Sequence, residues 1–245
     1  MKKHLKLLVL FISFGIVFST YKLFLKEKEK ITYIALGDSV AEGMNSYLQV
    51  DYGYTDYIKD YLNRNDRLSF YTKAFAKSGY TTNDLKNDIQ NNKIQIVDNK
   101  KIYLKEILRE SDLVTLTIGA NDYLKYLNIE STLLNIEDNK KQADKIIKEI
   151  KDLIELIKKY AKKQIIVTGY YNPLPRRKDI KNELDEIIRY FNYELEEICE
   201  ELSVKYVDIF NIFDNNEDYL PNPLDIHPNK KGYEKISKEI IKNIK

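Results

Sequence analysis

Hydrophobic residues in this chain alternate between short apolar runs and longer amphipathic stretches. Between the short runs, apolar residues recur at helical spacing over 54–63, 82–90, 104–110, 137–162 and 180–202, and a final helix is predicted over 232–245. The short runs themselves indicate buried strands at 31–36, 68–74, 113–118, 164–168 and 205–209. Because each run is almost continuously apolar, we expect helices to cover both faces of the sheet.

The alternation of strands and helices predicts the fold class. A strand, a helix and a further strand in sequence form a parallel pair joined by a right-handed crossover. We therefore expect an α/β domain over residues 31–245, a flavodoxin-like, three-layer αβα sandwich of about five parallel strands. Residues 26–30 (KEKEK) form a short charged linker before it.

The amino-terminal segment, residues 1–25, has a different character. Lys2, Lys3 and Lys6 precede 15 residues without a charge, at 7–21, and apolar residues resume after Lys22. A bilayer-spanning helix needs about 20 apolar residues, whereas the core of a signal peptide has about 7–15. We expect an uncleaved signal anchor, a single hydrophobic helix that contacts the membrane through residues 7–25, with the domain outside the cytoplasm. A cleaved signal and a secreted protein are the alternative.

Charge and cysteine content narrow the classes of function. Residues 1–30 carry seven Lys and two Glu, and the rest of the chain carries 33 basic and 36 acidic residues. This near-neutral, mixed body gives no reason to expect a nucleic-acid partner. The single cysteine, Cys199, lies in a helical pattern and is expected to be a buried structural thiol. Of the two histidines, only His227 belongs to the domain.

Polar residues and glycines collect just past the predicted strands, where the site of a parallel sheet is expected. These segments are 37–39 (Gly-Asp-Ser), 77–79 (Lys-Ser-Gly), 119–122 (Gly-Ala-Asn-Asp), 169–173 (Gly-Tyr-Tyr-Asn-Pro) and, before the last helix, 225–228 (Asp-Ile-His-Pro). Serine, glycine, asparagine and histidine at one edge are the groups that acyl transfer requires.

With these blocks in this order, residues 31–245 resemble the SGNH hydrolases, also called the GDSL lipase/esterase family. GDSVAEG at 37–43 is similar to the family's first block, with Val40 in place of the usual Leu, and SGY, TIGAND and DIHPNKKGY match the later blocks. Ala41 stands where a G-x-S-x-G motif would have its second glycine, so the nucleophile elbow of the α/β-hydrolases is not predicted.

The resemblance implies roles for individual residues. Ser39 would be the nucleophile and His227 the base that activates it. The Ser39 amide, the Gly79 amide and the Asn121 side chain would form the oxyanion hole. We expect Tyr170, Tyr171 and Asn172 to bind the substrate.

Two further aspartates are expected to support the loops. Asp38 is expected to hold the turn before Ser39 through hydrogen bonds. Asp122 is expected to brace its own loop while Asn121 faces the site.

The acid of the catalytic group departs from the family's pattern. The family has an Asp three residues before the histidine, where this chain has Leu224, and the nearest acid, Asp225, lies two residues before. Asp225 can reach the second imidazole nitrogen through a different turn, a backbone carbonyl can orient the ring instead, or Asp225 can serve only the turn. The sequence leaves all three open.

The expected activity is that of a metal-independent serine esterase or lipase-type acylhydrolase that needs no cofactor. Its substrate would be a lipid, a lysophospholipid, a simple ester or an acetylated glycan. One alternative is a Mg²⁺-dependent phosphoryl hydrolase that uses Asp38, Asp122 and Asp225, because hard cations favour carboxylates. Another is a catalytically inactive binding domain of the same fold.

Overall fold

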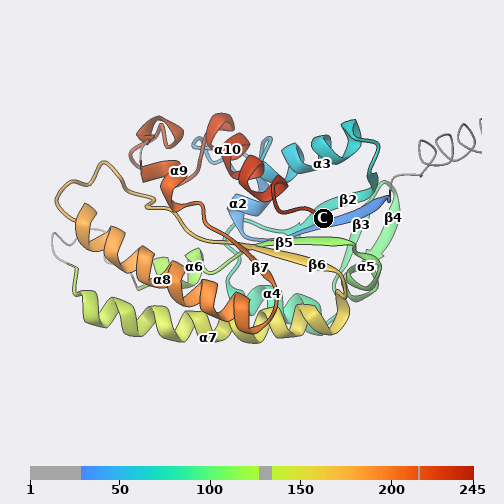
Figure 1. Cartoon of the computed structure of the whole chain (residues 1–245), viewed down its shortest axis with the longest axis horizontal. Coiled ribbons are helices and arrows are strands. Elements are labelled where there is room, and N and C mark those ends of the chain that lie inside the picture. Colours follow the sequence, from blue (N-terminus) through green and yellow to red (C-terminus); the bar gives the residue numbers. More distant parts are fainter. Residues whose placement is uncertain (1–28, 127–133, 215) are drawn as a thin grey trace, which may run out of the picture. The chain divides into compact units, whose positions relative to one another are not determined.

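Five parallel strands form the central sheet of the domain in the computed structural model (Figure 1). They are β1 (Ile31–Gly37), β2 (Leu68–Ala76), β5 (Leu113–Thr117), β6 (Gln164–Thr168) and β7 (Lys205–Val207). Their order across the sheet is β2-β1-β5-β6-β7, which is the flavodoxin-like order. The direction of winding reverses between β1 and β5, and in such sheets ligands bind beyond the carboxyl ends of the strands at this reversal.

The structure describes residues 29–126, 134–214 and 216–245, and residues 31–245 form one compact unit. The predicted anchor at 1–25 and most of the linker at 26–30 lie outside the described residues. Among the helices of the described ranges, none combines the length and the apolar character that crossing a bilayer requires.

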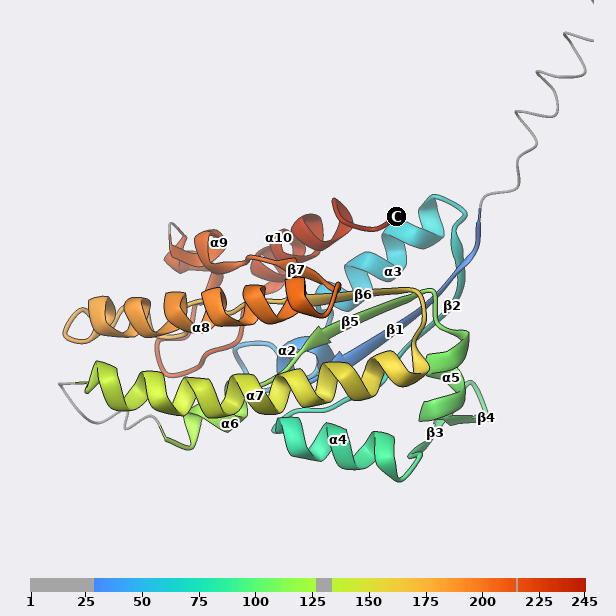
Figure 2. The ribbon, with the colours of Figure 1, turned by 60° about the horizontal axis from the view of Figure 1, so that its bottom comes forward.

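Helices cover both faces of the sheet, as the apolar runs predicted. One face carries α4 (Thr82–Gln90), α5 (Leu104–Glu110), α7 (Ile136–Tyr160) and α8 (Lys181–Glu201), the layer turned toward the viewer in Figure 2. The other face carries α3 (Tyr54–Arg64) and α10 (Lys230–Ile241). Successive strand residues alternate between the two cores: Ile34 and Leu36 contact the first layer, whereas Tyr33 and Ala35 contact the second. The predicted three-layer architecture is confirmed.

Four short helices were not predicted from the sequence. Two follow central strands directly, and all four span five residues or fewer, too few for a helical period to be recognised. They are α2 (Ser39–Glu42), α6 (Ala120–Leu124), α9 (Phe210–Asp214) and the 3₁₀ turn η1 (Glu217–Tyr219).

An antiparallel hairpin, β3 (Ile94–Val97) and β4 (Lys100–Tyr103), was also not predicted. It connects α4 to α5. Its two-residue turn, Asp98-Asn99, has positive φ at both positions, 49° and 61°. Asp and Asn tolerate this conformation, and the resulting twist suits a two-residue hairpin. The dipeptide was thus a local signal for the turn.

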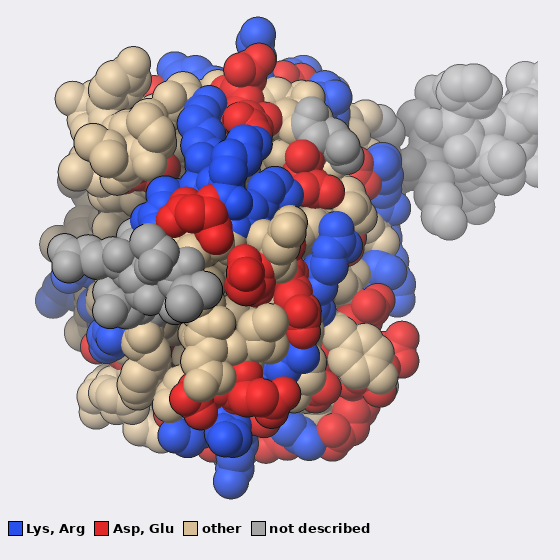
Figure 3. All heavy atoms as spheres, turned by 90° about the vertical axis from the view of Figure 1, so that its left-hand side faces the viewer, with Lys and Arg blue, Asp and Glu red and all other residues tan. Residues whose placement is uncertain are grey.

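Acidic and basic side chains are mixed at the end of the molecule where α8 begins (Figure 3). Several of them form ion pairs, including Lys178 with Glu217 and Lys181 with Asp214. Such partly exposed pairs contribute little stability. Figure 3 shows Lys and Arg side chains grouped above the centre of this face, with acidic side chains beside and below them.

Candidate active site

Ser39 lies at the end of the buried strand β1 and is itself buried. It is the first residue of α2, and Asp38 caps this helix because its Oδ1 accepts a hydrogen bond of 3.0 Å from the Val40 amide. The expected role of Asp38 in holding the turn is confirmed. The strand and the capped helix together fix the position of the Ser39 side chain.

Gly37 allows the ends of β1 and β5 to come close together. Its φ is +137°, and a Cβ at this position would lie 1.9 Å from the carbonyl oxygen of Thr117. The same carbonyl accepts a hydrogen bond of 2.9 Å from the Asp38 amide. A side chain at position 37 would therefore displace the segment that carries Ser39.

His227 joins Ser39 across 188 residues of sequence. Its Nε2 lies 2.8 Å from Ser39 Oγ, and its Nδ1 lies 2.8 Å from Oδ1 of Asp225. The ring is buried in the loop before α10. Ser39, His227 and Asp225 thus form one continuous line of hydrogen bonds.

Asp225 reaches the imidazole although it is one residue closer to the histidine than the family's pattern has it. Its Oδ1 also accepts a hydrogen bond of 2.8 Å from the His227 backbone amide. This turn brings the carboxylate back toward the ring, while Leu224 is 93% exposed. Of the three readings left open by the sequence, the structure agrees with direct contact by Asp225.

Gly79 lies in the loop between β2 and α4, and Asn121 lies in α6, at the start of the segment that follows β5. The backbone of Gly79 has a φ of +81°, and a Cβ there would meet no atom within 4 Å, so the space beside it is open. The Nδ2 group of Asn121 donates to the carbonyl of Tyr80 at 2.9 Å, which ties the two segments together. An amide group has two N–H donors, so one remains for a ligand.

Two carboxylates that brace these loops complete the site. Oε2 of Glu42 accepts hydrogen bonds from the amide, at 2.7 Å, and the hydroxyl of Ser78, and so connects α2 to the Gly79 loop. Oδ2 of Asp122 accepts from the amide and hydroxyl of Thr82, at 2.9 and 3.1 Å. The expected bracing by Asp122 is confirmed. The role of Glu42 was not predicted from the sequence, because it depends on contact with a residue 36 positions away.

The second oxygen of Asp38, Oδ2, is buried, and it has no hydrogen-bond partner among the described residues. Burial is the main reason that the pKa of this carboxyl is raised to about 7, with the nearby charge of Asp122 adding to the effect. Hydrogen bonds from the Val40 amide and neighbouring backbone act in the opposite direction. Asp38 is therefore a titrating group directly before Ser39.

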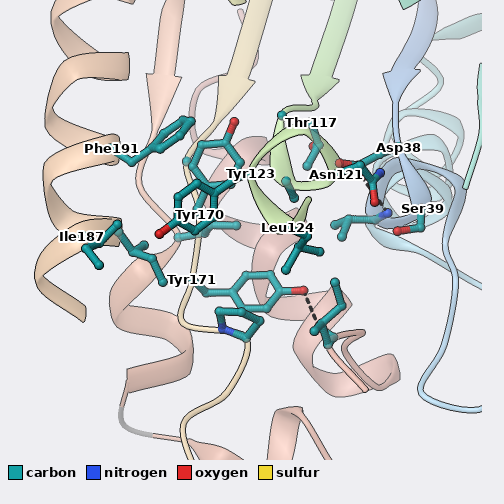
Figure 4. A pocket seen from close by; sticks show the side chains of 18 of the residues that line it. Asp38, Ser39, Thr117, Asn121, Tyr123, Leu124, Tyr170, Tyr171, Ile187 and Phe191 are labelled. Atoms are coloured by element: carbon teal, nitrogen blue, oxygen red, sulfur yellow. Dashed lines mark hydrogen bonds between the residues drawn. The ribbon is translucent and has the colours of Figure 1, made fainter. Parts of the chain in front are cut away.

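A cavity of about 80 Å³ opens beside Ser39 and extends toward α8 (Figure 4). Tyr170 and Tyr171, two of the residues predicted to bind substrate, line it, as does Asn121. Asn172 is not among the lining residues. Its side chain serves the loop instead, donating to Asp185 and accepting from the Leu174 amide.

Cys199 is a buried free thiol in α8, as predicted, and burial raises its pKa to about 12.

Among the described residues, no group of three or more His, Cys, Asp or Glu side chains is placed to hold a metal ion. Asp38, Asp122 and Asp225 each bind a different hydrogen-bond partner.

Comparison with known proteins places this geometry in a family. Residues 35–235 match the GDSL-like Lipase/Acylhydrolase family. YpmR of Bacillus subtilis (strain 168), an uncharacterized protein, is 27% identical over 231 residues, which cover 90% of this chain and 84% of YpmR.

Solved structures share the fold. The lipase Lip_vut3 from a goat rumen metagenome matches with a TM-score of 0.69 and 21% identity, over 86% of this chain and 95% of the lipase. A catalytic mutant of Axe2, an acetylxylan esterase from Geobacillus stearothermophilus, matches with a TM-score of 0.61 and 18% identity, over 90% and 96%. The family match spans most of the chain, and the resemblance seen in its motifs is confirmed: the chain belongs to the GDSL-like lipase/acylhydrolase family and is a carboxylic ester hydrolase.

Proposed function

We propose that the protein is a metal-independent serine esterase in which Ser39 is the nucleophile, His227 the general base and acid, and Asp225 the residue that orients the imidazole. The observation that carries this proposal is the line of hydrogen bonds from Asp225 through His227 to Ser39. A serine hydroxyl is a weak nucleophile at neutral pH and needs a base in contact with its oxygen.

In the first half of the reaction, Nε2 of His227 takes the Ser39 proton as Oγ attacks the ester carbonyl carbon. The tetrahedral intermediate collapses, the bond to the alcohol oxygen breaks, and His227 returns the proton to the departing alcohol. Water then attacks the acyl-enzyme with His227 again as base, and the acid leaves as Ser39 recovers its proton. Asp225 accepts from Nδ1 throughout and stabilises the charged imidazolium.

The negative oxygen of each intermediate needs donors that already point toward it. We assign this role to the amides of Ser39 and Gly79 and to the remaining N–H of Asn121. By analogy with mutated oxyanion holes, each donor contributes about 3 kcal/mol. Hydrogen bonds from Ser78 to Glu42 and from Asn121 to Tyr80 support the assignment, since they hold two of the three donors in place.

The setting we propose is outside the cytoplasm, with residues 7–25 retained as an anchor in the membrane. The sequence of this segment supports an anchor, because three lysines precede 15 residues without a charge; four lysines follow that run, so the lysines do not set the orientation. Membrane fractionation followed by sequencing of the mature amino terminus tests it. Recovery of a soluble chain that begins after residue 25 would instead support the cleaved signal.

Candidate substrates are lipid, lysophospholipid and simple esters and acetylated glycans, since solved proteins of this fold include a lipase and an acetylxylan esterase. The test is hydrolysis of p-nitrophenyl esters by the wild type and by Ser39→Ala, with and without EDTA. We expect activity that survives EDTA and is lost in Ser39→Ala. Activity abolished by EDTA would contradict the metal-independent mechanism, and equal rates in both proteins would contradict the role of Ser39.

A further inference from the structure

The cavity beside Ser39 has a polar end and an apolar end. Its polar side chains, Asp38, Ser39, Thr117 and Asn121, lie near the nucleophile, on α2, β5 and α6. Away from Ser39 the wall is made of hydrocarbon side chains, with Leu124 on one side and α8 on another (Figure 4). Apart from the tyrosines considered below, a ligand that fills the cavity therefore meets polar side chains at its reacting end.

Helix α8 supplies the apolar wall with one stripe of its surface. The four lining residues follow the spacing i, i+3, i+4 and i+7, which places them on one face of a helix. They are Leu184, Ile187, Ile188 and Phe191. All four are buried, so this wall is a fixed part of the core.

Three tyrosines also line the cavity, and each presents its ring because its hydroxyl is already bound. The Tyr123 hydroxyl donates to Oδ1 of Asn139 at 2.6 Å. The Tyr170 hydroxyl donates to the carbonyl of Ile118, and the Tyr171 hydroxyl donates to the carbonyl of Ile226 at 2.8 Å. A sugar or glycerol hydroxyl placed here would find no tyrosine O–H free to donate to it, and could only donate its own proton to a phenol oxygen. Burying a hydroxyl without a partner is unfavourable, whereas burying a methylene is favourable.

The two halves of an ester differ in this respect. Glycerol and sugar alcohols carry further hydroxyls, but the hydrocarbon chain of a carboxylic acid carries none. We propose that the apolar cavity is an acyl-chain pocket, so that the enzyme prefers esters of acids substantially longer than acetate. The inference rests on the proposed function, because it assigns the acyl half of the substrate to a wall that starts at Ser39.

Chain-length dependence tests the pocket directly. For p-nitrophenyl acetate, butanoate, hexanoate and octanoate, we expect kcat/KM to rise with length by up to about fourfold for each methylene that enters the cavity. The rise should stop when the pocket is full. Rates that are flat or that fall from acetate onward would overturn the inference while leaving the esterase intact.

A steric variant shows whether this cavity is responsible. Leu124 is only partly buried, so Leu124→Trp narrows the cavity from a position that tolerates a larger side chain. We expect the octanoate-to-acetate ratio of kcat/KM to fall by at least about tenfold, which corresponds to loss of two buried methylenes. Leu156→Trp is the matched control, because Leu156 is a partly buried leucine of α7 that does not line the cavity. An equal fall in both variants would contradict the assignment.

Binding without turnover separates this inference from the proposed function. In Ser39→Ala, calorimetric titration should detect octanoate but not acetate, and Leu124→Trp in the same background should abolish the octanoate signal. If Ser39→Ala binds octanoate but the wild type hydrolyses no ester, the acyl-chain pocket is supported and the proposed esterase function is rejected. Failure to bind octanoate, together with flat rates, would reject the pocket alone.

Discussion

Asp225 contacts His227 twice through a single oxygen, once at the backbone amide and once at Nδ1, each at 2.8 Å. The first contact closes a turn, and the second holds the ring. With two-residue spacing, the turn between Asp225 and His227 therefore places the carboxylate beside the imidazole.

Asp225→Asn is predicted to reduce kcat by about a thousandfold or more, because an amide favours the wrong imidazole tautomer and no longer stabilises the imidazolium. Steady-state hydrolysis of an activated ester measures the loss. Asp218→Asn, which removes the same charge from an exposed aspartate of η1, is the control and should be nearly silent. A loss under tenfold in Asp225→Asn would mean that another acceptor orients the ring.

The buried carboxyl of Asp38 makes stability depend on pH. Its pKa is raised from 3.8 to about 7 by burial, so between these values the native state holds a proton that the unfolded chain releases. The free energy of unfolding therefore falls as the pH rises through this window. Asn at position 38 can keep the cap but does not titrate.

We predict that the free energy of unfolding of Asp38→Asn, relative to that of the wild type, rises by about 3 kcal/mol between pH 5 and pH 8. Urea denaturation at both pH values measures this gain. Groups that titrate equally in both proteins cancel in the comparison. If the free energies of unfolding of the two proteins differ by the same amount at pH 5 and pH 8, Asp38 keeps its ordinary pKa.

Glu42 is predicted to act on catalysis through Ser78, because its carboxylate holds the loop that carries the Gly79 amide. Glu42→Ala should lower kcat by about tenfold with little change in KM, since an oxyanion donor acts mainly in the transition state. Glu110→Ala, at an exposed acid of α5, is the control.

A double-mutant cycle identifies the partner. If Glu42 works through Ser78, the effects of Glu42→Ala and Ser78→Ala on kcat should be far from additive. Additive effects would mean that Glu42 does not act through the Ser78 hydroxyl; its bond to the Ser78 amide, which Ser78→Ala keeps, would then be the contact that matters.

Gly37 and Gly79 both have positive φ, but they are predicted to differ in their tolerance of a side chain. Gly37→Ala would place Cβ 1.9 Å from the Thr117 carbonyl oxygen, so we expect a loss of more than about 3 kcal/mol or failure to fold. Gly79→Ala meets open space, and its cost should be limited to about 1–2 kcal/mol of backbone strain. Thermal unfolding of both variants measures the contrast, and equal shifts in Tm would contradict it.

The strands and long helices could be predicted because buried strands appear in the sequence as continuous apolar runs, and helices with one buried face appear as apolar residues at helical spacing. β6, α4 and α5 begin and end at the predicted residues. β7 is shorter than predicted, ending at Val207, because Asp208 uses its side chain to accept from the Phe210 amide at the start of α9. Local side-chain bonds of this kind compete with the ladder of a strand.

Within the site, residue types were predictable but contacts were not. Ser39, Gly79 and Asn121 follow strands, and topology alone brings strand ends together. His227 instead lies in the loop between η1 and α10. The partner of His227 depends on the turn from Asp225, and the role of Glu42 depends on its reach to Ser78. Asn172, predicted to bind substrate, instead bonds to Asp185 of α8 and to the Leu174 amide of its own loop. These outcomes arise from side-chain geometry across loops, which no period in the sequence encodes.

The claim that Ser39 is a nucleophile activated by His227 is tested most directly by covalent labelling. The folded protein is incubated with an alkyl fluorophosphonate and then digested. Mass spectrometry measures the mass of the peptide that contains Ser39. We predict one phosphonyl group on Ser39 in the wild type and none on that peptide in Ser39→Ala. In His227→Ala the labelling of Ser39 should be slower by about a thousandfold or more. Absence of label on Ser39 in folded wild-type protein, or labelling at an equal rate without His227, would contradict it.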